Sequence, residues 1–314
     1  MQDVLKYLKW KITERGARII GCDEEFEGAM EIPSCLDGAA VVEIGKDAFL
    51  ERRSLRSVAI PDSVEVVGKY AFAFCHWLEE LHLGAGIKKI GKGAFWGCRL
   101  LKRVAVPDSV ENVGVLAFFA CYELEELHLG AGIKKIEYGA FDSCRSLKSV
   151  AIPDSVEVVG EDAFKECSGL EELQLGAGIR KIEKSAFSLC KSLKRVAVPD
   201  SVEVVGEWAF SECSELEELQ LGTGIKKIEK YAFDSCSSLK SVEIPSTVES
   251  VGEEAFYYCT ELEELQLGAG IKKIEKGAFR GCSSLRRVVL PPRLEELARD
   301  AFDESVDLVF DDER

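Results

Sequence analysis

Cysteine is the residue type in this chain that could most readily act as a nucleophile, a redox group or a metal ligand, and its spacing is regular. Ten of the twelve cysteines lie three residues after a recurring phenylalanine, from Cys75 to Cys282 in steps of 23. Zinc and redox sites need close pairs such as Cys-x-x-Cys, and the sequence contains none. We therefore expect a ladder of small, buried, unreactive thiols, one per repeat, which favours a reducing compartment. The spacing of Cys22 and Cys35 leaves open whether they form a disulfide.

No other combination of side chains predicts catalysis. His82 and His128 occupy equivalent positions two repeats apart, so stacked strands would hold them about 9–10 Å from each other, too far to share a metal ion. The recurring Glu-Glu pairs follow a pattern of surface charge. The Gly-Ala-Gly turns lead to another strand and not to a helix, as a phosphate loop would. We therefore expect that the chain is not an enzyme and that it binds neither a cofactor nor a metal ion.

The charge and composition narrow the classes of partner. The chain has 314 residues, 46% of them hydrophobic, and a formal net charge of −16. A charge of this sign opposes binding to nucleic-acid phosphates or anionic lipids, so neither is expected as a partner. No segment approaches about 18 consecutive apolar residues, and the N-terminal segment carries charges where the apolar core of a secretory signal would lie. As written, the chain is expected to be cytoplasmic and without membrane insertion.

A strict repeat positions all of these residues. An Ala-Phe pair recurs every 23 residues, without insertion or deletion, from Phe49 to Phe302. Leu or a similar apolar residue follows six, nine and eleven residues after each Phe, as in Leu78, Leu81 and Leu83. One such coil cannot bury these side chains alone, whereas stacked coils can. The sequence therefore predicts a solenoid and excludes an irregular globular domain over this span.

The repeat resembles the BspA-type, Treponema-like class of leucine-rich repeats. The likeness rests on the L-x-x-L-x-L strand, on segments such as residues 147–160 and on the Ala-Phe-x-x-Cys turn at residues 163–167. The resemblance implies a β-rich, right-handed superhelix of 23-residue coils, with a parallel sheet on one face and short strands or 3₁₀ turns on the other. Because family members are mostly bacterial surface or secreted proteins, it also implies a surface or secreted location and an adhesin-like role.

Three parts can be distinguished along the chain. Residues 1–45 resemble the β-rich N-terminal cap of that family, residues 46–290 form the coils, and residues 291–314 are expected to form a C-terminal capping coil. The near-identical units fit both natural duplication and an engineered consensus frame.

A second period of 46 residues overlies the first. Alternate coils carry Pro-Asp-Ser, as at Pro61, or Gly-x-Gly, as at Gly84, after the strand. The charge seven residues after each Phe also alternates in sign, as in Arg56 and Glu79. Because exposed ion pairs contribute only about 0.2–1 kcal/mol each, we expect these charges to fix the register of the coils more than to stabilise them.

Comparison of the chain with itself locates the positions that vary most. Residues 58–103 and 150–195 are two copies of the 46-residue unit and differ at fourteen positions. Ten of these fall on five sites per coil, two residues before the Phe and one, two, four and five after it, which a helical or 3₁₀ turn would point outward. One copy has Asp162 where the other has Tyr70. Drift of exposed positions rarely introduces aromatic residues, so the pattern indicates a binding surface.

The variable sites predict two aromatic patches on the turn face of the solenoid. The first patch consists of Tyr70, Phe74, His76, Trp77, Trp96, Leu100, Leu116, Phe119 and Tyr122. The second patch consists of Trp208, Tyr231, Tyr257 and Tyr258. Aromatic clusters rimmed by His and Arg have the composition of protein-binding hot spots, whereas the sheet face is monotonous.

We therefore expect a non-enzymatic scaffold that recognises a protein partner through the first patch. Three alternatives stay open. The aromatic side chains could fold over the edge of the coils as additional core, or form the homodimer interface of a structural, self-assembling protein. As a surface adhesin, the chain could also bind a host protein or stack its aromatic rings on carbohydrate.

Overall fold

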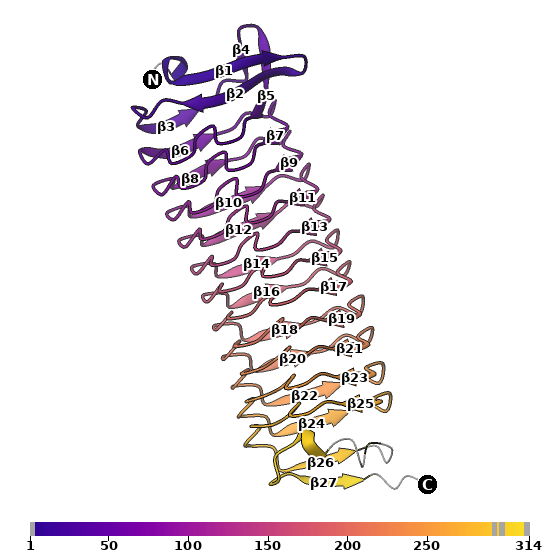
Figure 1. Cartoon of the computed structure of the whole chain (residues 1–314). Helices are drawn as coiled ribbons and strands as arrows, with labels where there is room; N and C mark the ends of the chain where they lie inside the picture. Colours follow the sequence, from indigo (N-terminus) through magenta and orange to yellow (C-terminus); the bar gives the residue numbers. More distant parts are fainter. Residues whose placement is uncertain (1–3, 291–293, 295–298, 311–314) are drawn as a thin grey trace. The chain divides into compact units, whose positions relative to one another are not determined.

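Each full coil contributes two strands, a longer one from the L-x-x-L-x-L segment and a two-residue one from the apolar pair that follows. The computed structural model describes residues 4–290, 294 and 299–310. The chain divides into two compact units, Met1–Ser155 and Val156–Arg314. Both units are β-solenoids of parallel strands with 23-residue coils, as predicted (Figure 1).

In the first unit, the long strands form one parallel sheet, in the order β3-β6-β8-β10-β12-β14. The short strands continue a second sheet, in the order β1-β2-β5-β7-β9-β11-β13, in which β1 is antiparallel to β2 and β4 pairs with β5. The register advances by one coil at each step, so that Val104 lies opposite Leu127. A 3₁₀ helix, η1 (Val4–Tyr7), precedes the first strand. The strands are β1 (Leu8–Thr13), β2 (Gly16–Cys22), β3 (Gly28–Glu31), β4 (Cys35–Leu36), β5 (Ala39–Ile44), β6 (Leu55–Ala59), β7 (Val66–Val67), β8 (Glu80–His82), β9 (Lys89–Ile90), β10 (Arg103–Val106), β11 (Asn112–Val113), β12 (Glu126–Leu129), β13 (Lys135–Ile136) and β14 (Ser149–Ala151).

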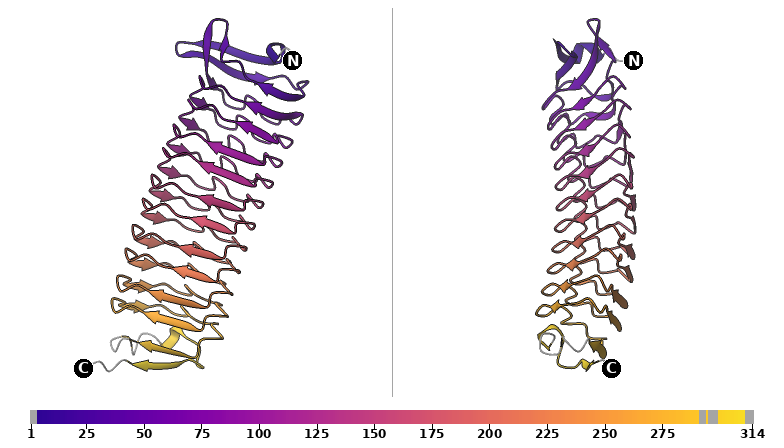
Figure 2. Two further views of the ribbon diagram at one scale, coloured as in Figure 1. Left: turned by 180° about the vertical axis from the view of Figure 1, so that it is seen from behind. Right: turned by 90° about the vertical axis from the view of Figure 1, so that its right-hand side faces the viewer.

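The second unit repeats this arrangement. Its long strands have the order β16-β18-β20-β22-β24 and its short strands the order β15-β17-β19-β21-β23-β25, and the two sets form separate columns (Figure 2). Of the C-terminal coil expected at residues 291–314, residues 291–293, 295–298 and 311–314 lie outside the described part, and β26 pairs in parallel with β27. The elements are β15 (Val158–Val159), β16 (Glu172–Gln174), β17 (Lys181–Ile182), β18 (Arg195–Ala197), β19 (Val204–Val205), β20 (Glu218–Gln220), β21 (Lys227–Ile228), β22 (Ser241–Ile244), β23 (Ser250–Val251), β24 (Glu264–Leu267), β25 (Lys273–Ile274), β26 (Arg287–Leu290), η3 (Arg299–Ala301) and β27 (Asp307–Phe310).

A ladder of phenylalanine rings fills the core of each unit. The recurring Phe residues of neighbouring coils stack with ring centroids 4.7–5.4 Å apart and ring planes within 14° of each other. The Ala before each Phe is also buried, as at Ala71. Stacked rings at this spacing combine burial of apolar area with a favourable aromatic geometry, which explains why the 23-residue step is kept without exception.

The ladder cysteines are buried, as predicted, and they also donate hydrogen bonds. The Sγ atom of Cys75 lies 3.0 Å from the carbonyl oxygen of Phe49 in the preceding coil, and that of Cys98 lies 3.3 Å from the carbonyl oxygen of Phe72. The same bond recurs along both units, with Cys282 as its last donor. Each of these Phe carbonyls also accepts the backbone N–H of the residue three positions later, as Phe49 does from Arg52, so the thiol is its second donor. Cys22 and Cys35 are both free thiols.

The segment that carries the Phe is a chain of tight turns with two left-handed residues. In every coil from Phe49 to Phe279 the residues two before and two after the Phe have positive φ, for example 55° at Tyr70 and 60° at Phe74. The N–H groups alternate in their partners. Those of Tyr70 and Phe72 donate to the next coil, at Lys92 and Ala94, whereas that of Ala73 donates to Tyr70 within the turn.

The 46-residue period has a structural cause at the opposite turn. The carboxylate of Asp62 accepts a hydrogen bond of 2.7 Å from the backbone N–H of Ala85 in the next coil. In turn, the hydroxyl of Ser109 donates to the carbonyl of Ile87, in the coil before it, at 2.6 Å. A Cβ atom at Gly86 would lie 1.9 Å from the carbonyl oxygen of Asp62, so glycine is required there. A Pro-Asp-Ser coil and a Gly-x-Gly coil are therefore complementary neighbours.

Candidate functional site

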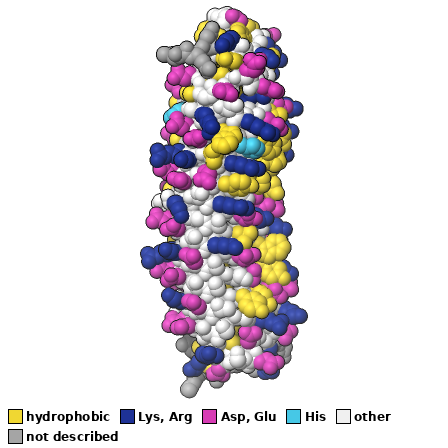
Figure 3. Space-filling model, turned by 90° about the vertical axis from the view of Figure 1, so that its left-hand side faces the viewer, with side chains coloured by type: hydrophobic (Ala, Val, Ile, Leu, Met, Phe, Trp, Pro, Cys, Tyr) yellow, Lys and Arg dark blue, Asp and Glu magenta, His cyan; other side chains and the backbone are white. Residues whose placement is uncertain are grey.

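Both predicted patches lie on turn segments, which are defined here as the stretch from three residues before the repeat Phe to five residues after it. Figure 3 views this side of the molecule. In its upper part, hydrophobic side chains gather beside a column in which basic side chains alternate with hydrophobic and His side chains. The first patch belongs to the first unit and the second patch to the second.

Three rings of the first patch contact Trp96. The Trp96 ring lies 6.0 Å from Tyr70, 5.4 Å from Phe74 and 5.5 Å from Phe119, between ring centroids. His76 joins the cluster through an edge contact of 5.9 Å with Phe74. These side chains come from three successive coils, so the structure assembles the cluster from the positions that the sequence singled out. All five are half-buried.

His76 is held in place by a backbone acceptor. Its Nδ1 atom lies 2.9 Å from the carbonyl oxygen of Gly97 in the next coil. Because a carbonyl oxygen can only accept, Nδ1 carries the proton in this bond. The Nε2 atom of the same ring is then available as a second polar contact beside the aromatic cluster.

Trp77 and Tyr122 are bordered by arginine side chains. The Arg56 guanidinium lies 4.6 Å above the Trp77 ring and also pairs with Glu79 at 3.0 Å. Trp77 is 48% exposed, an unusual value for so large an apolar side chain. Tyr122 lies between Arg99 and Arg145, whose guanidinium carbons are 5.8 and 5.1 Å from its ring centroid. These contacts are cation–π interactions, which orient both partners.

Bulky side chains in the turn lie over glycines of the following coil. Tyr70 covers Gly93, Phe74 covers Gly97 and Leu116 covers Gly139. Two further members of the first patch, Leu100 and Leu116, are also half-buried. A non-glycine residue with positive φ costs on the order of 1 kcal/mol or more, and bulky residues are the least tolerated there. Three members of the first patch, Tyr70, Phe74 and Leu116, thus occupy left-handed positions that favour glycine.

Three of the ten variable sites do not face outward. Ala73 is fully buried, and Gly93 and Gly97 are buried beneath the rings of Tyr70 and Phe74. The expectation that all five sites per coil point to solvent is therefore wrong for these residues. Its physical reason is the conformation of the turn, because two left-handed residues direct the chain differently from a helical or 3₁₀ turn.

The sequence interpretation missed Tyr138, which is 44% exposed, and its neighbour Val115. Both lie three residues before a repeat Phe, where most other coils carry Lys or Glu. The backbone N–H of Leu116 donates to the Tyr138 carbonyl, which places this residue one coil beyond the first patch. The break in the Lys/Glu pattern was the signal that could have identified both residues.

The structure brings the second patch together as two pairs. Trp208 and Tyr231 stack with ring centroids 5.5 Å apart and planes at 9°, and Tyr257 contacts Tyr258 edge-on at 4.3 Å. Lys184 lies 4.7 Å above the Trp208 ring. This patch has fewer rings in contact than the first, and Tyr258 is its most exposed member.

The buried thiols have no environment that would activate them. Burial raises the pKa of the Cys75 and Cys213 thiols to about 12, and it raises the pKa of Cys98 and Cys190 well above the ordinary value. A buried thiol with a pKa this high has a very small fraction of thiolate at neutral pH, and the thiolate is the form that acts as a nucleophile or metal ligand. Among the described residues, no three His, Cys, Asp or Glu side chains are grouped as metal ligands.

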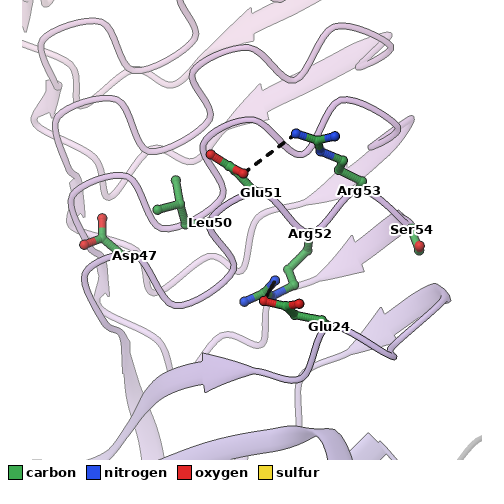
Figure 4. A pocket seen from close by; sticks show the side chains of 7 residues that line it. All are labelled: Glu24, Asp47, Leu50, Glu51, Arg52, Arg53 and Ser54. Atoms are coloured by element: carbon green, nitrogen blue, oxygen red, sulfur yellow. Dashed lines mark ion pairs between the residues drawn. The ribbon is translucent and has the colours of Figure 1, made fainter.

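A hollow lies where the N-terminal strands meet the first coil (Figure 4). Arg52 reaches toward Glu24, at 3.6 Å, and Arg53 pairs with Glu51 at 3.8 Å. The Nε atom of Arg52 is buried without a hydrogen-bond partner. The lining residues are Glu24, Asp47, Leu50, Glu51, Arg52, Arg53 and Ser54. Because Glu24, Glu51 and Arg53 are largely exposed, the hollow is an open polar depression and not an enclosed ligand site.

Comparison with known proteins agrees with this architecture. A family model described as "BspA type Leucine rich repeat region (6 copies)" matches residues 42–171, 134–263 and 215–309. No curated protein matches the chain. Among the described residues, no helix has the length and apolar character needed to span a membrane.

Several solved structures are similar in fold. A leucine rich cell surface protein from Faecalibacterium prausnitzii is 24% identical, with a TM-score of 0.57 over 98% of this chain and 94% of that one. The pneumococcal vaccine antigen PcpA is 16% identical, with a TM-score of 0.56 over 96% of this chain and 98% of that one. A leucine-rich repeat protein from Eubacterium ventriosum is 19% identical, with a TM-score of 0.50 over 98% and 92%.

Proposed function

The chain belongs to the BspA-type leucine-rich repeat family, and from this premise we propose that it is a non-enzymatic scaffold that binds a protein partner through the first patch. The observation that carries the proposal is the cluster of Tyr70, Phe74, Phe119 and His76 around Trp96, with Trp77 exposed beside it. Rigid aromatic anchors bordered by arginine are the usual centres of protein–protein interfaces.

The composition of the equivalent coils supports this proposal. In the coil 92 residues later, the same turn sites carry Asp162, Glu166, Ser168 and Gly169. That coil has the same backbone conformation, with positive φ at Asp162 and Glu166. The frame therefore does not need aromatic residues at these sites. Their presence in the first unit leaves apolar area in solvent and bulky residues at left-handed positions, both of which oppose stability.

The exposure of Trp77 favours a binding role for the first patch over a role as additional core. The glycines beneath Tyr70 and Phe74 account for the partial burial of these two rings, but Trp77 remains 48% exposed and contacts Arg56 at the surface. A large exposed indole with an ordered cationic neighbour is preorganised for contact with another molecule. Because similar structures include a cell surface protein and a vaccine antigen, we place the partner outside the cell, as expected of an adhesin.

The test replaces the first patch by residues that the chain itself uses at equivalent positions. The variant Tyr70→Asp, Phe74→Glu, His76→Ser, Trp77→Gly and Trp96→Ser introduces the residues found 92 positions later. Partner proteins captured by the wild-type chain are identified and purified, and their affinity is measured by calorimetry. We expect binding to be lost in this variant, with unchanged circular dichroism.

A matched control and a solution measurement distinguish the alternatives. Trp208→Asp and Tyr231→Ser remove aromatic side chains from the second patch and are expected to leave the affinity unchanged. Sedimentation at increasing concentration tests self-association. A dimer that the first-patch variant abolishes would favour the homodimer alternative, and retention of the partner by that variant would refute the proposal.

A further inference from the structure

The turn face of the first unit carries a column of alternating basic and ring-bearing side chains. Four residues after the repeat Phe, successive coils present Arg53, His76, Arg99, Tyr122 and Arg145. Three of the five are arginines, and they recur at every second coil. Figure 3 shows basic side chains alternating with His and hydrophobic ones along this face. We refer to these five residues as the arginine column.

The arginine column lies on a positively charged part of an acidic protein. The turn segments of the five coils in the first unit contain seven basic and four acidic residues, although the whole chain has a net charge of −16. The basic residues are Lys46, Arg52, Arg53, Lys69, Lys92, Arg99 and Arg145. In the second unit the turn segments of the six coils from Phe164 to Phe279 contain six basic and ten acidic residues. The local excess of positive charge therefore coincides with the first patch and not with the second.

Two arginines of the column, Arg53 and Arg99, make only weak contacts that would compete with a carboxylate. Arg53 pairs with Glu51 at 3.8 Å, and both side chains are more than half exposed, so the pair contributes little. Arg99 is exposed, and its guanidinium carbon lies 5.8 Å from the centroid of the Tyr122 ring, a cation–π contact that does not use the N–H donors of the group. Charged guanidinium groups held in this way are suited to bidentate bonds with carboxylates.

The spacing of the arginines selects the conformation of a bound segment. Strands in a sheet are about 4.7–4.9 Å apart, so equivalent residues two coils apart are separated by about 9.5 Å. A polyproline II helix has three residues per turn and a rise of about 3.1 Å per residue, so every third side chain recurs on one face after about 9.3 Å. In a β-strand, side chains on one face recur after about 6.6–6.8 Å, which does not match.

We infer that the partner contacts the first unit through an extended acidic segment in the polyproline II conformation, with a carboxylate at every third residue. This inference rests on the proposed function and names the chemistry of the partner. The three carboxylates bind Arg53, Arg99 and Arg145. Between them, proline or another apolar residue packs against His76 and Tyr122, as proline-rich ligands do in aromatic-lined grooves.

The test uses a defined probe. Fluorescein-labelled (Glu-Pro-Pro)5 is titrated with the full chain at low salt, and binding is followed by fluorescence polarisation. A peptide of the same composition with its five glutamates in one block keeps the charge and length but removes the three-residue spacing. We expect the spaced peptide to bind at least tenfold more tightly than the blocked peptide, and (Lys-Pro-Pro)5 not to bind. Equal affinity for the two acidic peptides, or no binding of either, would overturn the inference.

A triple variant tests the residues. Arg53→Ser, Arg99→Ser and Arg145→Ser introduce the residue that four of the six coils from Phe164 to Phe279 carry at the same position, for example Ser168. We expect at least a tenfold loss of affinity for the spaced peptide. The charge-matched control removes three exposed arginines from long strands, by the substitutions Arg103→Ser, Arg195→Ser and Arg287→Ser. The control is expected to bind like the wild type, and an equal loss in both variants would contradict the inference.

The two proposals fail in different ways. If the aromatic variant loses its purified partner while the arginine triple variant retains it, the proposed function holds and the acidic segment is wrong. If the spaced peptide binds through the arginines but the aromatic variant still holds its partner, the inferred site exists and the aromatic cluster is not the interface.

Discussion

The ring of Tyr70 lies over the α-carbon of Gly93 in the next coil, so that a Cβ atom at Gly93 would be 2.4 Å from two carbons of that ring. Gly93 also has a φ of 59°, in the left-handed region. The aromatic residue and the glycine are therefore coupled: one fills the space that the other leaves. The same relationship joins Leu116 to Gly139, where the closest approach would be 2.6 Å.

Substitution of Gly93 by Ala should reveal this coupling. We expect Gly93→Ala to lower the free energy of unfolding by about 2 kcal/mol, because left-handed strain adds to displacement of the Tyr70 ring. In a Tyr70→Asp background only the strain of about 1 kcal/mol remains. Urea unfolding of the four proteins gives the coupling energy directly. Equal losses in both backgrounds would show that the ring moves aside freely.

The left-handed positions themselves predict a stabilising substitution. Glu212 has a φ of 57° and an exposed side chain, whereas exposed Glu215, three residues later, does not have positive φ. Glu212→Gly should raise the free energy of unfolding by about 0.5 kcal/mol through relief of strain, and Glu215→Gly should lower it by about 0.5–1 kcal/mol. Thermal unfolding of the two variants is the measurement. Changes of the same sign would contradict the assigned turn conformation.

Thiol reactivity should separate one cysteine from the other eleven. Cys35 is exposed, whereas Cys22 and the ten ladder cysteines are buried, and burial raises the pKa of Cys22 to about 11. In the native protein we expect Ellman's reagent to modify one thiol rapidly, and in denaturant all twelve. A disulfide between Cys22 and Cys35 would instead give no rapid reaction and only ten thiols after unfolding.

The buried thiols should make the protein sensitive to alkali. Burial raises the folded-state pKa of Cys75 and Cys213 to about 12, above the unfolded value of about 8.5. The unfolded state therefore loses protons first, and the stability is retained below about pH 8.5 and falls between that pH and about 12. Each such thiol lowers the free energy of unfolding by up to about 1.4 kcal/mol per pH unit in that window.

Urea unfolding at pH 7, 8, 9 and 10 checks this slope. The variant Cys213→Ala is less stable at neutral pH, because it loses a buried side chain, but its stability should fall less steeply above pH 8.5. If the wild type and this variant show the same slope, the thiol of Cys213 is not protected from ionisation by burial.

The sequence was sufficient to predict the solenoid because its main cause is local and repeated. A Phe at every twenty-third position is explained only by rings that stack from coil to coil, and apolar residues at fixed distances from it define both strands. The ladder of buried cysteines followed from the same spacing. Its hydrogen bond to the carbonyl of the preceding coil did not, because a thiol is a weak donor that sequence patterns rarely mark.

The candidate site was predicted in composition but not in detail. The choice of Tyr70, Phe74 and Trp96 came from comparing repeats, and the structure places these rings in contact. The burial of Ala73 was missed because it depends on the left-handed residues of the turn, whereas the exposure of Tyr138 could have been read from the break in the Lys/Glu pattern. Side chains such as Tyr, Phe and Asp give no sign of positive φ, since glycine is the residue that normally indicates it.

The bonds of Asp62 to Ala85 and of Ser109 to Ile87 have a consequence for how such a chain can grow or shrink. Loss of one coil would set two Pro-Asp-Ser turns side by side, each without the glycine-flanked partner that accommodates it. Loss of two coils would restore every bond at the junction. Coils can therefore be inserted or lost in pairs without loss of these hydrogen bonds. An odd number of inserted or lost coils would place two turns of the same type next to each other, without the hydrogen bonds between them.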